Sequence, residues 1–246
     1  MPRPAIDINC DLGEWGHPEP SPDDALFPLI SSANVACGFH AGDAAVMAET
    51  AARCARDGIA VGAHPSYRDR EGFGRRDMDP PADVLLAELA EQLEALAGSG
   101  AELKYVKPHG ALYNRIGHDD PQADVVARAA AAAGLPLLGQ PGTAIHRAAA
   151  RHGVRFVTEG FLDRAYRDDG SLVPRSQPGA LITDPDAAGR RAVRIVLEGV
   201  VETITGGEIA LRVESLCVHS DTPGALGILQ AVHSALQSAG IDRRAF

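Results

Sequence analysis

The feature that most constrains the fold is a regular alternation of short β-branched runs with longer segments rich in alanine and leucine. The short runs have strand length, and the longer segments carry apolar residues at helical spacing. Such alternation is typical of βα units and a mostly parallel sheet. We expect strands at 5–10, 33–38, 58–63, 103–107, 135–139, 154–158 and 213–218, and helices at 43–57, 82–98, 120–133, 143–152, 186–200 and 223–239.

No Pro/Ser-rich linker, charge block or low-complexity tract divides the 246 residues. With about seven repeats, we expect one domain over residues 1–246, a β/α barrel with about seven parallel strands. An open dinucleotide-binding sheet is disfavoured, because no GxGxxG fingerprint follows the first strand. The segment 160–185 has the length and composition of a functional loop rather than of a spacer.

Charge and short motifs exclude several classes of function. The net charge of −10 repels phosphate backbones and anionic lipids, so we expect no nucleic acid and no membrane partner. No Gly-Lys step exists, so any ATP use must avoid a Walker A loop. The four cysteines lack Cys-x-x-Cys spacing, which argues against a zinc knuckle and a disulfide framework. The N-terminus lacks the basic and apolar regions of a signal peptide, and we expect a cytoplasmic protein.

Histidine placement is the most informative chemical signal. Four of the nine histidines fall one to three residues past the end of an expected strand: His40, His64, His109 and His219. The carboxyl ends of parallel strands meet on one face, so these imidazoles should converge. Asp11 and Glu159 follow strands in the same way. One such histidine is more often a capping or loop residue, but four together favour a functional rim.

Two local contexts place acids beside these strand ends. Asn9, Asp11 and Glu14 cluster around a glycine that allows a tight turn, which suits orienting a ligand or dividing acid and base roles. The alternative for Asp11 is a helix N-cap. His40 is followed three residues later by Asp43, which could instead cap the next helix.

Basic groups complete the rim. Lys107 and His109 flank a proline, so two donors can face one carboxylate or oxyanion. Arg75, Arg76 and the Asp163-Arg164 step add guanidinium groups able to bind carboxylate or phosphate, although exposed Asp–Arg pairs are often structural.

The blocks INCDLGE, SSANVACGFHAGD, GAHPSYRDREGFGRR, KPHGALYN, FLDRAYRDDGSLVPRSQPGA and CVHSD, in this order, closely resemble the LamB/YcsF family between residues 6 and 241. The resemblance implies a barrel akin to those of polysaccharide and carbohydrate deacetylases. It also implies opening of the 5-oxoproline lactam to L-glutamate with ATP and Mg²⁺, by a 5-oxoprolinase whose partner subunits are B and C. Two departures stand out: Ser220 replaces the usual glycine between His219 and Asp221, and the loop of residues 15–20 is longer than the common form.

The unstrained lactam is a poor electrophile, and phosphorylating its oxygen would make the ring carbon attackable. In this interpretation Lys107 and the Arg75/Arg76 pair hold the substrate carboxylate or phosphate, while a rim acid or imidazole activates water. The catalytic candidates are Asp11, Glu14, His40, His64, Lys107, His109 and Glu159. The substrate-binding candidates are Asn9, Asp43, Arg75, Arg76, Asp163, Arg164, His219 and Asp221.

Two other interpretations stay open at the level of sequence. The first is metal-dependent amide deacylation without ATP, in which Asp11, His64 and His109 supply the Asp-His-His ligand set that the resemblance to deacetylases implies, although no His-x-x-x-His pair supports it. The second is a non-catalytic protein that binds 5-oxoproline and presents it to catalytic partners.

Overall fold

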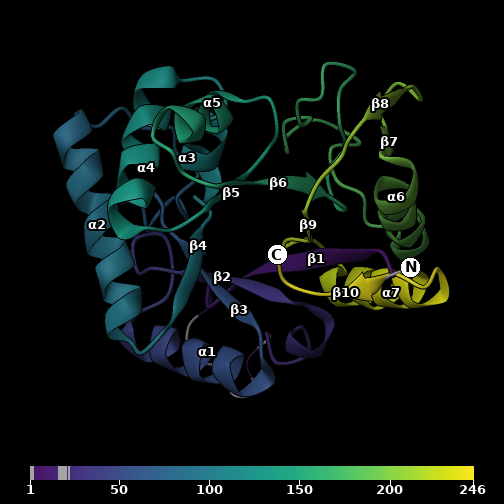
Figure 1. Cartoon of the computed structure of the whole chain (residues 1–246), viewed down its shortest axis with the longest axis horizontal. Coiled ribbons are helices and arrows are strands. Elements are labelled where there is room, and N and C mark those ends of the chain that lie inside the picture. Colours follow the sequence, from purple (N-terminus) through teal and green to yellow (C-terminus); the bar gives the residue numbers. More distant parts are fainter. Residues whose placement is uncertain (1–2, 16–20, 22) are drawn as a thin grey trace. The chain divides into compact units, whose positions relative to one another are not determined.

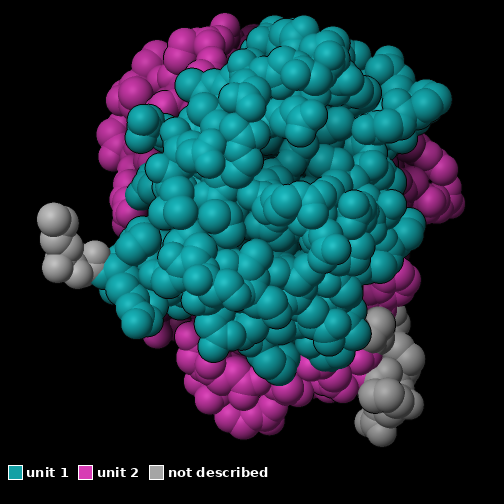
Figure 2. All heavy atoms as spheres, turned by 90° about the vertical axis from the view of Figure 1, so that its right-hand side faces the viewer, with its two compact units in different colours: residues 1–10, 25–31, 158–246 teal, residues 11–24, 32–157 magenta. Residues whose placement is uncertain are grey.

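The computed structural model describes residues 3–15, 21 and 23–246, so most of the long loop after Glu14, residues 16–20, lies outside the described residues. Contacts along the chain divide it into two compact units (Figure 2). Unit 1 comprises residues 1–10, 25–31 and 158–246, and unit 2 comprises residues 11–24 and 32–157.

Unit 2 is built on four parallel strands, β2 (Ser32–Ala36), β3 (Ala60–His64), β4 (Leu103–Val106) and β5 (Leu137–Gly139), paired in chain order. Helices return the chain between them (Figure 1): α1 (Ala44–Asp57), α2 (Ala82–Gly98), α3 (Gly110–Arg115), α4 (Asp120–Ala133) and, after β5, α5 (Ala144–Arg151). Because every crossover is a helix, the carboxyl ends of these strands lie at one edge.

Capping residues explain where the helices of unit 2 begin and end. The Asp43 carboxylate accepts hydrogen bonds from the backbone N–H groups of Ala45 and Val46, and Gly58 ends α1 with a positive φ of 69°. Asp119 caps α4 through the N–H of Gln122. These residues are the start and stop signals that the sequence carries at 43–57 and 120–133.

Unit 1 contains a second set of parallel strands. β1 (Ala5–Leu12), whose last two residues belong to unit 2, pairs with β9 (Ser215–Cys217) and β10 (Asp242–Arg243), and β9 also pairs with β6 (Phe156–Phe161), which enters unit 1 at residue 158. α6 (Pro185–Glu198) and α7 (Ala225–Ser238) pack together at Gly189, where an added Cβ would lie 3.2 Å from the Ala231 carbonyl oxygen. The remaining elements are η1 (Phe27–Leu29) and an antiparallel hairpin, β7 (Val200–Glu202) and β8 (Glu208–Ala210).

The structure contains all seven strands and six helices that the alternation predicts, with ends shifted by at most three residues. The helix predicted to reach residue 200 ends at Glu198, because Gly199 takes a positive φ and the next residues form β7. The β7–β8 hairpin, α3 and β10 were not predicted. That residues 1–246 form one domain stays a prediction. None of the described helices is both long and apolar enough to span a membrane.

Candidate metal centre

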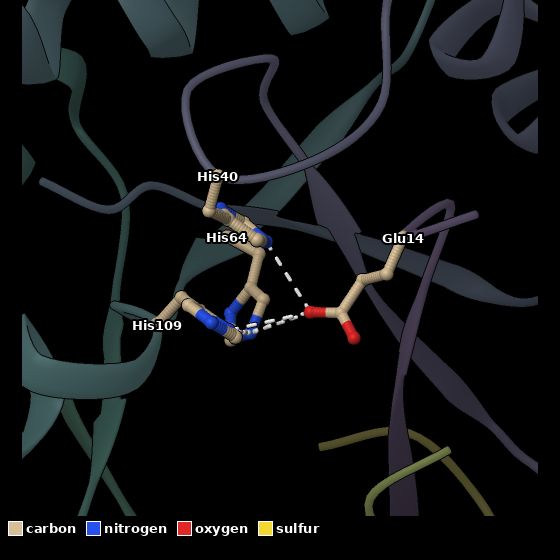
Figure 3. A group of neighbouring side chains, drawn as sticks. All are labelled: Glu14, His40, His64 and His109. Carbon is tan, nitrogen blue, oxygen red and sulfur yellow. Dashed lines mark hydrogen bonds and ion pairs between the residues drawn. The ribbon is translucent and has the colours of Figure 1, made fainter. Parts of the chain in front are cut away.

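Four side chains from four successive strand ends meet in unit 2 (Figure 3). Glu14 lies two residues beyond β1, His40 four beyond β2, His109 three beyond β4, and His64 is the last residue of β3. All four are buried, and one ligand atom from each lies within 4.8 Å of the others. Three of the imidazoles expected at the rim therefore converge, together with one of the expected acids.

The hydrogen bonds of Ser66 determine which nitrogen of His40 carries the proton. The Ser66 hydroxyl donates to the Tyr67 carbonyl oxygen at 2.8 Å, so it accepts from His40 Nδ1 at 3.0 Å. His40 Nε2 then presents a lone pair to Glu14 Oε1, 3.2 Å away. Burial lowers the pKa of His40 to about 3 despite the opposing contact with Glu14, so the ring is neutral at pH 7.

The other two imidazoles are fixed by backbone carbonyl groups. His64 Nδ1 donates to the Lys107 carbonyl oxygen at 2.6 Å, and His109 Nε2 donates to the Phe73 carbonyl oxygen at 2.9 Å. A neutral imidazole has only one N–H group. If both rings are neutral, the inward-facing atoms His64 Nε2 and His109 Nδ1, which lie 3.0 Å apart, carry the lone pairs. These assignments follow from the hydrogen-bond network.

Glu14 completes an inward-facing set of acceptors. Glu14 Oε1 lies 3.2 Å from His109 Nδ1 and 3.9 Å from His64 Nε2. With the histidine protons placed outward and Glu14 ionised, four ligand atoms with lone pairs would face one another, and a divalent cation at their centre would be attracted by all four.

The donor chemistry fits such an ion. Three imidazole nitrogens with one carboxylate oxygen suit zinc and similar divalent transition ions, and each histidine donates its other N–H group outward, as metal-ligating histidines do. Mg²⁺ prefers oxygen ligands, so this centre does not suit it. The residues present therefore fit a divalent metal.

Asp11 and Lys107 lie beside the four ligands. Asp11 Oδ1 is 3.5 Å from His64 Nε2, accepts from Asn34 Nδ2 at 2.8 Å and lies 3.4 Å from Lys107 Nζ. Asn34 Oδ1 in turn accepts from the Tyr105 hydroxyl at 2.7 Å. The four-residue group contains Glu14 and His40 with two of the expected ligands, His64 and His109, and the expected ligand role of Asp11 beside it stays a prediction. Asn34 and Tyr105 were not predicted as site residues, although Asn34 stands in the block SSANVACGFHAGD.

A strained turn after β3 supports the centre. Phe73 is the only non-glycine among the described residues with a positive φ, 54°, and its carbonyl oxygen receives His109 Nε2. At the next residue, Gly74, an added Cβ would lie 2.9 Å from both His109 Cδ2 and His40 Cβ. The turn can therefore pack against the two ligands only with glycine at position 74.

We expect Gly74→Ala to weaken binding of a divalent ion by at least about tenfold, because the methyl group displaces His40 or His109. Gly58→Ala is the matched control, since Gly58 has nearly the same φ, 69° against 66°, but no atom within 4 Å of an added Cβ. Titration of both metal-free variants with Zn²⁺ or Co²⁺ measures the difference. Equal affinities in the two variants would contradict the role of the turn.

The remaining basic and acidic candidates of unit 2 lie at its surface. Asp43 is exposed and caps α1. Arg76 is exposed and pairs with Asp69 at 3.5 Å, and the Arg75 guanidinium lies over the Phe73 ring at 5.1 Å. Their predicted role in substrate binding stays a prediction.

In unit 1, Asn9 and Glu159 belong to a buried network between strands. Asn9 Nδ2 donates to Glu159 Oε1 at 2.9 Å and to Ser215 Oγ at 2.8 Å. Ser215 Oγ donates to Asp7 Oδ2 at 2.5 Å. These contacts join β1, β6 and β9, and a catalytic role for Glu159 or a binding role for Asn9 stays a prediction.

The other four candidates lie beyond the carboxyl ends of β6 and β9. Asp163, fully buried, accepts from the backbone N–H and Nδ1 of His219 and from the Thr222 hydroxyl. Burial alone would raise the pKa of Asp163, but the charge and hydrogen bonds of His219 and the hydrogen bond from Thr222 outweigh burial and lower the pKa to about 2. Asp221 pairs with Arg175, which was not predicted as a site residue although it lies in the block FLDRAYRDDGSLVPRSQPGA. Ser220 does not have a positive φ, so its replacement of glycine introduces no left-handed strain.

Comparison with known proteins identifies the family of this chain. Residues 6–246 match the LamB/YcsF family. The chain belongs to the LamB/YcsF family. A relative from Streptomyces coelicolor, named as the A subunit of 5-oxoprolinase, is 50% identical over 98% of this chain and 99% of its own length. The resemblance seen in the sequence is thereby confirmed.

Solved structures agree on the fold. The crystal structure of the lactam utilization protein from Thermus thermophilus has a TM-score of 0.91 and 44% identity, covering 98% of this chain and 100% of that one. The predicted fold class, a β/α barrel of parallel strands, is confirmed. A T48 deacetylase solved with substrate covers 98% of this chain and 87% of its own at a TM-score of 0.51 and 16% identity, a likeness of fold alone between it and this LamB/YcsF chain.

Proposed function

We propose that this chain is the A subunit of a 5-oxoprolinase, which hydrolyses the lactam of 5-oxo-L-proline to L-glutamate with ATP and Mg²⁺, together with subunits B and C. The names of close relatives support this proposal. The observation that carries it is the set of four inward-facing lone-pair donors, Glu14, His40, His64 and His109. A divalent ion held by these residues would polarise an amide carbonyl as a Lewis acid.

The hydrogen bonds suggest a different role for each of the rim residues: metal ligand, proton acceptor or stabiliser of negative charge. The three histidines donate their N–H groups outward, which makes them ligands rather than proton acceptors. Asp11 is the remaining acid beside the centre, 3.5 Å from His64 Nε2, and we assign it to accept the proton of the attacking water. Lys107, 2% exposed, neutralises the charge of Asp11 and that of an oxyanion formed beside it.

In the proposed reaction, ATP activates the lactam and is bound away from the metal centre. Transfer of the γ-phosphoryl group of ATP to the lactam oxygen, with release of ADP, would activate the ring carbon; water then adds to it, the ring C–N bond breaks, and phosphate is released. The sequence contains no Walker A loop to hold the nucleotide. We therefore assign ATP, with its Mg²⁺, mainly to the partner subunits. This division also agrees with a histidine-rich centre that does not suit Mg²⁺.

A second candidate function uses the same centre without ATP. Metal-dependent deacylation of an amide needs a Lewis acid and a neighbouring base, and Asp11 lies beside the four-residue ligand set. A protein that only binds 5-oxoproline has less support, because a buried set of mutually repelling ligand atoms is costly in a pure scaffold.

We expect the purified chain alone to release little or no glutamate from 5-oxoproline and to gain this activity when mixed with subunits B and C, ATP and Mg²⁺. The physical reason is the missing phosphate loop. Glutamate release is measured with the chain alone, with the partners alone and with the mixture, before and after removal of transition ions by a chelator. Robust ATP-dependent release by the chain alone would contradict the partner requirement. Chelator-sensitive acetate release from an N-acetylated sugar without ATP would favour the deacylase.

A further inference from the structure

The loops that follow β6 and β9 in unit 1 contain buried hydrogen-bond donors that lack acceptors. Arg164 is only 7% exposed, and its Nη2 donates to the Val173 carbonyl oxygen at 2.7 Å, but its Nε has no partner among the described residues. The buried Ser220 hydroxyl likewise has none. Because an unpaired buried polar group is costly, two of them in neighbouring loops indicate an absent acceptor.

Arg175 adds a guanidinium group with unused donors. Its Nη1 lies 3.2 Å from each oxygen of Asp221, longer than the 2.7–2.9 Å typical of charge-assisted hydrogen bonds, and no described residue accepts from its Nε or Nη2. Burial lowers the pKa of Arg164, and the charge of Arg175 lowers it further. Asp221 is therefore the internal anion that pairs with Arg175.

The acceptors of this region are already engaged. The Asp163 carboxylate accepts from His219 N at 3.0 Å, from His219 Nδ1 at 2.9 Å and from Thr222 Oγ1 at 2.6 Å. These bonds fix the His219 ring, which also stacks on Phe161, with its Nε2 lacking a partner among the described residues. The loops thus present hydrogen-bond donors on three side chains, Arg164, Arg175 and Ser220, that no described residue accepts.

We propose that these loops bind an oxyanion, either a phosphate or a carboxylate, through Arg164, Arg175 and Ser220. The ligand supplies the missing acceptor oxygens and replaces Asp221 as the anionic partner of Arg175. Guanidinium groups are well matched to both kinds of oxyanion. The site lies in unit 1 and does not depend on the metal centre, so binding of metal and binding of anion can fail separately.

Isothermal titration with inorganic phosphate, and separately with L-glutamate and 5-oxoproline, tests the proposal on the full chain. Arg175→Ala should weaken binding of the preferred anion by about tenfold or more, because a charge-assisted contact is lost. Asp221→Asn should strengthen it, because the competing internal anion is removed. Arg190→Ala, an exposed arginine of α6, is the matched control and should bind as the wild type does.

The opposite signs of the two substitutions separate binding from structure. Damage to the loops would weaken binding in both variants, and circular dichroism and thermal unfolding check that both remain folded. Binding of phosphate but neither carboxylate identifies a phosphate site, and the reverse result identifies a carboxylate site. Absence of binding for all three anions in the wild type, or equal affinities in Arg175→Ala and the wild type, would overturn the proposal.

Discussion

His64→Ala and His109→Ala should each reduce the bound divalent ion from about one per chain to a small fraction and lower reconstituted turnover by about 10³-fold. Each substitution removes one of the four lone-pair donors, and the remaining three no longer enclose the ion. Metal content by mass spectrometry and turnover with subunits B and C are measured on the same preparations. His152→Ala, in which a partly exposed histidine loses its pair with Asp124, is the matched control and should change neither quantity.

Residues that hydrogen-bond to the metal ligands should affect metal binding and turnover less than the ligands themselves. Ser66→Ala removes the acceptor of His40 Nδ1 but leaves all four ligands, so affinity and turnover should fall by roughly 10–100-fold, less than in His40→Ala. If His64→Ala kept its metal and its turnover, the centre would not be a metal site. If Ser66→Ala were as impaired as His40→Ala, the proposed order of inner and outer contacts would be wrong.

The fold could be predicted closely because the pattern that determines it is local. The periodicity of apolar residues indicates each strand and helix, and capping residues such as Asp43 and Gly58 stand directly beside the helix ends that they determine. The β7–β8 hairpin was not predicted because the expected helix was extended to residue 200, although two short β-branched runs flank the Gly206–Gly207 turn. The rule that parallel strands share a carboxyl edge was sufficient to bring His40, His64 and His109 together.

The details of the centre could not be predicted for a different reason. The acceptors that orient His64 and His109 are the backbone carbonyl groups of Lys107 and Phe73, and every residue carries such a group. Which acid completes the ligand set also depends on the turn after β1: Gly13, with a φ of 69°, lies between the strand residue Asp11 and Glu14. A sequence shows both acids but not how each of them lies relative to the three histidines.

Lys107→Ala should lower reconstituted turnover by about 10²–10³-fold and also lower the melting temperature. The structure gives the reason for the second effect, since the buried Lys107 lies 3.4 Å from the buried Asp11. Removing one partner of a buried ion pair leaves an uncompensated charge and costs about 3–5 kcal/mol of stability. Lys104→Ala is the matched control: Lys104 is the only other lysine, lies on the same strand β4, and forms an exposed pair with Glu102.

Two further variants separate the catalytic role of Lys107 from its structural role. Lys107→Met combined with Asp11→Asn removes both charges, so the melting temperature should recover while turnover stays low, because the proton acceptor and the ammonium group are both absent. Lys107→Arg keeps the charge, but a planar guanidinium group cannot occupy the place of a compact ammonium ion buried beside Asp11, so we expect only partial turnover. Unchanged turnover in Lys107→Ala would exclude a catalytic role. Turnover that recovered with stability in the double variant would reduce Lys107 to a structural partner of Asp11.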